Sequence, residues 1–189
     1  MWGDVMKTLK VLALSGSLRK TSLNTAMLVM AGASAPTGVC VTLYGGLGGL
    51  PLFNPDLELN LPDKVTELLD QIAQADALLI ASPEYAHGVS GVMKNALDWM
   101  VSSAVFVDKP VALWNASPRA SIALAALRET LAVMSARLID TASLKLLIKS
   151  MDPAGPAVNP DPVAMQAALR ALRASLAQGA LARMARSAA

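Results

Sequence analysis

The chain has 189 residues, of which 54% are hydrophobic, 16% charged and 4% aromatic, and its formal net charge at pH 7 is +2. This length fits one domain with a sizeable core, and the composition is that of a globular protein and not of a disordered one. The weak, dispersed charge argues against nucleic acid as a partner, while one Cys and one His exclude an internal disulfide and argue against a transition-metal site.

The first predicted strand is the apolar run at 9–14, and a helix follows at 22–32. The apolar run is too short to span a membrane and barely reaches the length of the apolar region of a signal peptide. We therefore expect no membrane segment here and a cytoplasmic protein.

A polar turn at 15–24 joins this strand to its helix. Backbone N–H groups and the positive end of the helix dipole meet in such a turn, which favours an anion. It lacks both the Gly-Lys-Ser/Thr ending of a Walker A loop and the three spaced glycines of a dinucleotide fingerprint. We interpret it as a cradle for a phosphate monoester, such as the end of flavin mononucleotide (FMN), the alternative being a helix cap without ligand. Its side-chain donors are Ser15, Ser17, Arg19, Thr21, Ser22 and Asn24.

The next segments continue the alternation of strand and helix. A short strand is predicted at 39–43, followed by a long connection at 44–60 that is rich in Gly and Pro. Asn60 is the expected cap of the second helix, with Pro62 near its first turn. The run at 77–81 is apolar on both faces, as a central parallel strand should be.

A second polar turn, at 82–91, follows this central strand. Tyr85 offers an aromatic face and Gly88 lets the main chain approach a ligand closely, so backbone N–H groups here would reach the polar edge of a flavin ring. His87 is either a contact to that ring edge or a plain loop histidine. A hydrolase built on His87 and Ser90 is disfavoured, because 88–91 is one residue short of the Gly-x-Ser-x-Gly elbow and Ser90 suits a helix N-cap.

The remaining elements are a helix at 91–101, a strand at 111–115, a turn at 116–121 before a fourth helix, a fifth strand within 138–148, and a last helix at 163–177. The breaker-rich link at 152–162 is not a domain boundary. Five alternations predict an α/β fold in a single domain, 1–189, with a five-stranded parallel sheet of order 2-1-3-4-5 and helices on both faces. In that order both polar turns open into the crevice between strands one and three.

The two turns carry paired motifs that resemble a known family. Residues 16–24 match Gly-Ser-x-Arg-x-x-Ser-x-Asn at every fixed position, and 83–85 together with 94–99 match a second signature. Over about 10–134 the chain resembles the NADPH-dependent FMN reductases of flavodoxin-like fold, which are related to bacterial quinone and chromate reductases. Ala86 stands where many members carry Asn, and 117–119 replaces the glycine-rich third loop of many relatives.

The resemblance implies that the first turn holds the FMN phosphate and that the second lines the ribityl chain and ring. No side chain is expected to act as a catalyst and no metal is expected, because the flavin carries the chemistry. The predicted cofactor-binding residues are Ser15, Ser17, Arg19, Ser22, Leu23, Asn24, Pro83, Glu84, Tyr85, Ala86, His87, Gly88 and Ser117.

The expected activity is hydride transfer from NADPH or NADH to bound FMN and then to a quinone or similar small acceptor, with ping-pong kinetics. An apolar helix at 91–101 and the resemblance predict a homodimer or a tetramer built from dimers, the alternative being a helix that is simply buried within one chain. One alternative is an FMN-binding electron carrier or flavin-handling protein, but carriers are usually strongly acidic. Another is an interaction protein on a degenerate flavodoxin scaffold. Arg119 and Lys20 are either contacts to a 2′-phosphate or plain surface charge.

Overall fold

The computed structural model describes residues 7–117, 119–146, 148 and 161–187, so most of the 152–162 link lies outside the described residues. The strands are β1 (Leu9–Ser15), β2 (Val39–Tyr44), β3 (Ala77–Ala81), β4 (Glu84–Tyr85), β5 (Gly88–Val89), β6 (Pro110–Asn115), β7 (Arg137–Leu138) and β8 (Leu144–Lys145). The α-helices are α1 (Leu23–Ala33), α2 (Asp63–Gln74), α3 (Gly91–Met100), α4 (Ile122–Val133) and α5 (Pro162–Ser187). Short 3₁₀ turns are η1 (Leu47–Gly49), η2 (Pro55–Leu57), η3 (Ala104–Phe106) and η4 (Asp140–Ala142).

The main sheet is parallel and has the strand order β2-β1-β3-β6-β7, with β8 also paired to β6. Counted along the chain without the small β4–β5 hairpin, this is the predicted order 2-1-3-4-5, and the flavodoxin-like fold is confirmed. The order reverses between β1 and β3, which places a crevice at their carboxyl ends.

The fifth strand position is occupied by two short strands instead of one. β7 pairs with the start of β6 and β8 with its end, and η4 lies between them. In this gap the backbone N–H of Leu113 donates to the Ser143 hydroxyl at 3.2 Å, so a side chain replaces a ladder bond. The single fifth strand predicted within 138–148 is therefore interrupted.

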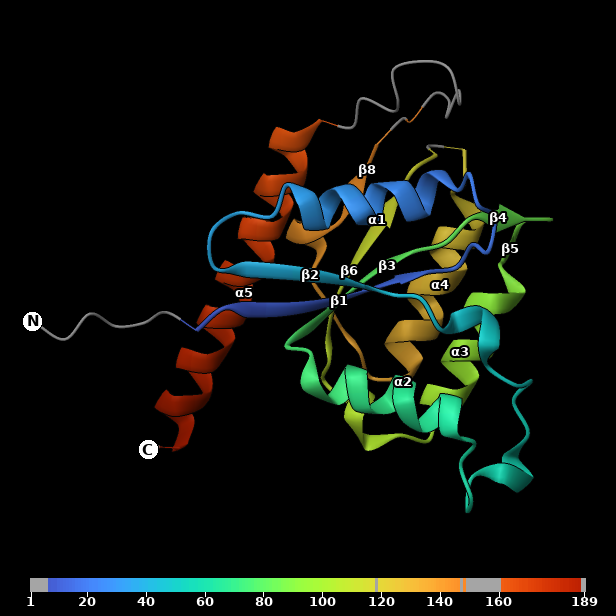
Figure 1. Ribbon diagram of the computed structural model, residues 1–189. Helices are drawn as coiled ribbons and strands as arrows, with labels where there is room; N and C mark the ends of the chain where they lie inside the picture. The colour runs from blue at the N-terminus through green and yellow to red at the C-terminus, as the bar shows by residue number, and fades with distance from the viewer. Residues whose placement is uncertain (1–6, 118, 147, 149–160, 188–189) are drawn as a thin grey trace, which may run out of the picture.

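Alternate residues of the strands face two separate cores. On one side Leu12 and Leu14 pack with α2, α3 and α4, and on the other Val11 and Ala13 pack with α1 and α5. Figure 1 shows α1 on one face of the sheet and α2 with α3 on the other. The near-continuous burial of β3 is what a central parallel strand requires.

The ends of the helices agree with their sequence signals in most cases. Ser22 caps α1, and its Oγ accepts from the backbone N–H of Thr25. Asn60 is not the cap of α2, because that helix begins one residue after Pro62 and has no side-chain cap. The last helix is longer than predicted and continues to Ser187.

Helix α3 was expected to present apolar side chains to a partner. Its Met93, Ala96, Leu97, Trp99 and Met100 are all buried in the chain's own core. The apolar character of α3 is thus explained within one chain and gives no argument for association.

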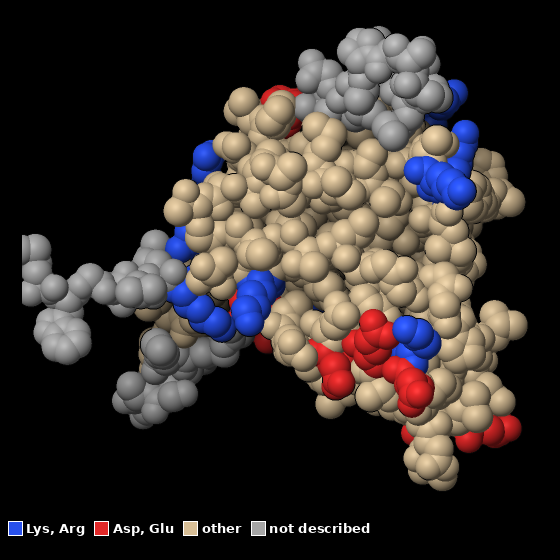
Figure 2. Space-filling view, in the orientation of Figure 1, with Lys and Arg blue, Asp and Glu red and all other residues tan. Residues whose placement is uncertain are grey.

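The surface agrees with the dispersed charge of the sequence. In Figure 2 charged side chains lie around the rim of the visible face and leave its centre uncharged. Within the described ranges, no helix has both the length and the hydropathy needed to cross a membrane.

Candidate functional site

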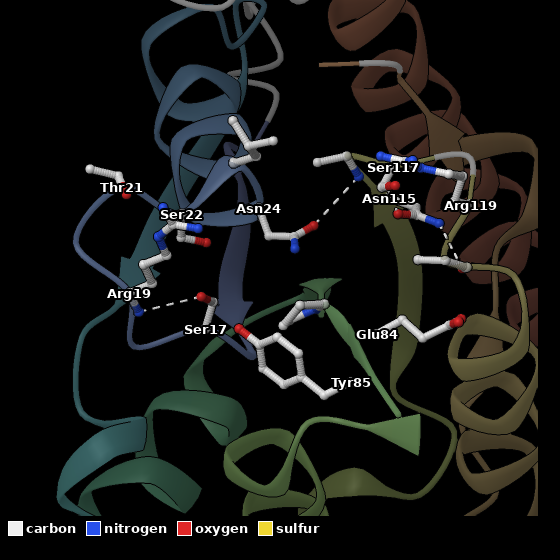
Figure 3. Close-up of a pocket in the computed structure, with 14 residues that line it drawn as sticks. Ser17, Arg19, Thr21, Ser22, Asn24, Glu84, Tyr85, Asn115, Ser117 and Arg119 are labelled. Atoms are coloured by element: carbon white, nitrogen blue, oxygen red, sulfur yellow. Dashed lines mark hydrogen bonds between the residues drawn. The ribbon is translucent and has the colours of Figure 1, made fainter. Parts of the chain in front are cut away.

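Three loops at the carboxyl ends of β1, β3 and β6 enclose a pocket of ≈ 330 Å³. Figure 3 shows side chains of the first loop on one wall and of the third loop on the opposite wall, with Tyr85 of the second loop below them. The pocket lies at the crevice that the strand order predicts. It is lined by Ser17, Arg19, Thr21, Ser22, Leu23, Asn24, Pro83, Glu84, Tyr85, Asn115, Ala116, Ser117, Arg119 and Ala120.

The first wall is built to receive an anion. Leu23 and Asn24 open α1, and the first turn of a helix leaves backbone N–H groups without an intrahelical partner. No acidic residue occupies this turn, so nothing in it competes with an anion for the helix N-terminus. Arg19 adds a guanidinium, and Ser17 and Thr21 add hydroxyls. This donor set fits a phosphate monoester.

Two predicted contact residues also connect the loops to one another. Ser15 does not line the pocket, and its hydroxyl lies 2.7 Å from the Thr25 hydroxyl, which fastens the strand end to α1. Asn24 does line it, and its Oδ1 accepts from the backbone N–H of Ala116 at 3.4 Å. A side chain that follows the first loop thus helps to hold the third loop in position.

A buried serine fixes the first loop from below. The Ser90 hydroxyl donates to the Gly16 carbonyl at 2.6 Å and accepts from the backbone N–H of Met93, which confirms Ser90 as the N-cap of α3. Ser90 is 3% exposed. Its hydroxyl faces Gly16, while His87 is bonded to Glu84, so the two do not form the nucleophile–base pair of a hydrolase.

The second turn contains a β-hairpin, β4 and β5, whose loop has two residues. Glu84 pairs with Val89 and Tyr85 with Gly88, and the connecting residues Ala86 and His87 have φ of 49° and 60°. Positive φ at both positions is the geometry of a type I′ turn. Of the residues predicted here to bind the cofactor, Pro83, Glu84 and Tyr85 line the pocket, whereas Ala86, His87 and Gly88 do not.

Glu84 fastens this hairpin to α4. Its Oε2 accepts from the backbone N–H of Ala123 at 2.9 Å, and its Oε1 lies 3.0 Å from Nδ1 of His87. The hydrogen bond from Ala123 is the main cause that holds the pKa of the Glu84 carboxyl below its ordinary value, and the bond to His87 adds to it. Since both carboxylate oxygens already have hydrogen-bond partners, Glu84 is suited to holding the hairpin in position and not to abstracting a proton. His87 is 75% exposed and is held by Glu84 outside the pocket.

Glu84→Gln is expected to remove an acid-dependent part of the stability. The folded-state pKa of Glu84 lies below its ordinary 4.5, so the carboxylate stabilises the fold above that pH and the stabilisation is lost as pH falls through the folded-state pKa. Because Gln does not ionise, the variant's free energy of unfolding should fall less than that of the wild type between about pH 6 and pH 3. Chemical denaturation at a series of pH values measures this difference.

The matched control is Glu129→Gln, which changes an exposed carboxylate on α4, the helix that Glu84 contacts. It should keep the wild-type pH dependence. If Glu84→Gln also kept it, the anchoring role of Glu84 would be wrong.

The third loop is shaped by Asn115, a buried polar residue at the end of β6. Its Nδ2 donates to the Ala120 carbonyl at 3.0 Å and its Oδ1 accepts from the backbone N–H of Ser117 at 2.9 Å. Ser117 lines the pocket as predicted. Asn115 was missed as a site residue, although an amide that ends an apolar strand is a readable signal. Pro118 lies outside the described residues.

Comparison with known proteins identifies a family match over most of the chain. The model of the NADPH-dependent FMN reductase family matches residues 9–148. The chain is 43% identical over 112 residues to the NAD(P)H-dependent FMN reductase PA1204 of Pseudomonas aeruginosa, which covers 58% of this chain and 60% of that protein. It is 45% identical over 112 residues to an NADPH:quinone oxidoreductase of Arabidopsis thaliana, which covers 56% of each. The matches thus span roughly three fifths of these relatives' lengths.

A solved structure supports the same grouping. The flavoenzyme FerB of Paracoccus denitrificans, an NAD(P)H:acceptor oxidoreductase, has a TM-score of 0.75 and 28% identity to this chain. The superposition covers 90% of this chain and 98% of FerB.

Proposed function

The chain belongs to the NADPH-dependent FMN reductase family, and from this premise we propose that it is an FMN-dependent NAD(P)H oxidoreductase that reduces a quinone or a similar small acceptor. The observation that carries the proposal is the first wall of the pocket, where Arg19 lies beside Ser22 and the N-terminus of α1. A phosphate at that position would extend the rest of the molecule toward Tyr85 and the third loop. The size of the pocket and its position in the sheet suit such a ligand.

The residues of the pocket hold and orient the cofactor. Ser17, Arg19 and Ser22 would bind the phosphate. Asn24 would donate to the phosphate from its Nδ2, while its Oδ1 accepts from the backbone N–H of Ala116. When bound, FMN supplies the redox chemistry, hydride acceptance from a nicotinamide and transfer to an acceptor.

The chain's own side chains need not act as acid or base. Glu84 is the one carboxylate among the residues that line the pocket, and both its oxygens are engaged. Tyr85 is 58% exposed, and its ring presents a flat face that suits stacking against a planar ligand. We propose that both substrates use the same opening in turn, which gives ping-pong kinetics.

The test of this function begins with an absorbance spectrum of the purified protein after incubation with FMN and desalting. Bound flavin absorbs visible light, and a coloured protein is the expected result because the donor set matches a phosphate monoester. Steady-state NADPH and NADH oxidation with a quinone then tests the reaction. A protein that stays colourless would contradict the proposal, and one that binds FMN without oxidising either nicotinamide would be an electron carrier or a flavin-handling protein.

The assembly and the location of the protein are part of the same proposal. The resemblance supports a homodimer or a dimer of dimers, and the cytoplasmic location is a separate part of the proposal that does not rest on the resemblance. Sedimentation equilibrium of the holoprotein measures the oligomeric state, and a single species at the mass of one chain would contradict the proposed dimer or tetramer.

A further inference from the structure

A second arginine lines the pocket on the wall opposite Arg19. Arg119 belongs to the third loop, and Figure 3 shows its side chain beside Ser117 and Asn115, across the pocket from Arg19 and Ser22. Its guanidinium makes no ion pair or hydrogen bond with any residue that the structure describes. In the family that the chain resembles, many members have a glycine-rich loop here, so this cation is a departure that the common fold does not require.

The charges of the pocket leave Arg119 without compensation. The lining residues include two guanidinium groups and one carboxylate, that of Glu84. Glu84 is committed to His87 and to the backbone of Ala123. A phosphate on the first wall would be balanced by Arg19 and by the N-terminus of α1. One positive charge then remains on the opposite wall.

The position of Arg119 is also unfavourable for the fold itself. It lies two residues before Ser121, the N-cap of α4, where the helix dipole is positive. A cation at a helix N-terminus is repelled by the dipole, and no described residue offers Arg119 a partner that would offset this. A cation that costs stability and points into a pocket is best explained by an anion that arrives there.

We propose that Arg119 binds an anionic group carried by the substrate, a phosphate, sulfonate or carboxylate, once the first wall holds the FMN phosphate. This inference rests on the proposed function and names the chemical class of its substrate. A guanidinium presents paired N–H donors that fit the oxygens of such groups. Two sources share this chemistry, the 2′-phosphate that distinguishes NADPH from NADH and an acidic group on the acceptor.

The experiment measures binding and not turnover, on protein saturated with FMN and at low ionic strength. Isothermal titration compares NADP⁺ with NAD⁺, and 1,2-naphthoquinone-4-sulfonate with 1,2-naphthoquinone, for the wild type and for Arg119→Gln. In at least one pair, the variant should bind the member with the additional anionic group roughly tenfold more weakly, with a change below about twofold for the member that lacks this group. Arg119→Lys should recover part of the lost affinity, because Lys keeps the positive charge but lacks the paired N–H donors of the guanidinium. A loss in the nicotinamide pair identifies the 2′-phosphate as the anion that Arg119 binds, and a loss in the quinone pair identifies an acidic group on the acceptor.

Controls separate a local contact from the general charge of the protein. Arg170→Ala removes the same charge from α5, outside the pocket, and should leave both ratios unchanged. Arg119→Gln should unfold at the same temperature as the wild type or higher, since it removes a cation from the N-terminus of α4. Equal losses for the two members of each pair, or no loss in either pair, would overturn the role of Arg119. Failure of the proposed function shows instead as absence of flavin in the spectrum and overturns the role of Arg119 as well, whereas the titrations on FMN-loaded protein test that role by itself.

Discussion

Gly16→Ala is expected to lower both FMN affinity and the stability of the chain. A Cβ at this position would lie 2.5 Å from the Ser82 hydroxyl and 2.8 Å from that of Ser90. Rotation of the Ser82 hydroxyl does not relieve the contact, because the Ser82 Cβ would still lie 2.9 Å away. Ser90 is held because it donates to the Gly16 carbonyl and caps α3, and the Gly16 N–H itself donates to the Ala81 carbonyl at 2.8 Å. The added methyl group must therefore push the first loop away from α3.

The size of this effect follows from overpacking at a buried site. Inserting a methyl group into a close-packed region costs about 1–3 kcal/mol, and we expect that loss in the free energy of unfolding, measured by chemical denaturation. FMN affinity, measured by quenching of flavin fluorescence, should fall by about tenfold or more, because the phosphate donors follow Gly16 directly in the chain.

Gly45→Ala is the matched control for this substitution. A Cβ at Gly45 would meet no atom within 4 Å, so the variant should bind FMN and unfold as the wild type does. Equal behaviour of the two variants would mean that the contact between Gly16 and the two serines does not shape the site.

The first wall of the pocket could be predicted from sequence because it is local. The strand, the turn and the start of α1 occupy one continuous segment, and the cap residue Ser22 lies next to the first helical residue. The strand order also followed from the sequence, since parallel strands with right-handed crossovers leave few topologies.

The second turn was placed correctly, but its hairpin was not foreseen. Type I′ turns are usually marked by Asn-Gly or Asp-Gly, and here Ala86 and His87 take the two positions with positive φ. The hairpin is also held by a contact between Glu84 and Ala123, 39 residues apart in sequence. No local pattern reports a contact of that separation, so the positioning role of Glu84 required the structure.

The third loop and the interrupted fifth strand could not be predicted in detail for a related reason. Asn115 acts through backbone groups of the loop that follows it, and Ser143 replaces a ladder bond to Leu113, 30 residues away. Both effects depend on which side chain meets which backbone atom. A two-residue strand such as β7 or β8 is too short to give a periodic signal.

Arg19→Ala is expected to have the largest effect on FMN binding among substitutions that leave the fold intact. Arg19 lines the pocket and lies beside Ser22 and the start of α1, and it makes no ion pair within the part of the chain that the structure describes. A charge-assisted hydrogen bond is worth about 1.5–3 kcal/mol, so the dissociation constant of FMN should rise by roughly ten- to a hundredfold. Because no internal contact is lost, the free energy of unfolding without FMN should stay near that of the wild type.

Lys20→Ala separates this contact from the general charge of the loop. It removes the same charge one residue further along, but Lys20 is exposed and does not line the pocket. Its effect on FMN binding should therefore be small and should vanish at high salt, since screening at about 0.1 M already acts over roughly 10 Å. The Arg19→Ala loss should persist there, because a direct hydrogen bond to phosphate is screened less than a distant charge. If fluorescence quenching gave equal FMN affinities for the two variants, Arg19 would act as a remote charge, and the first wall would not be the phosphate site.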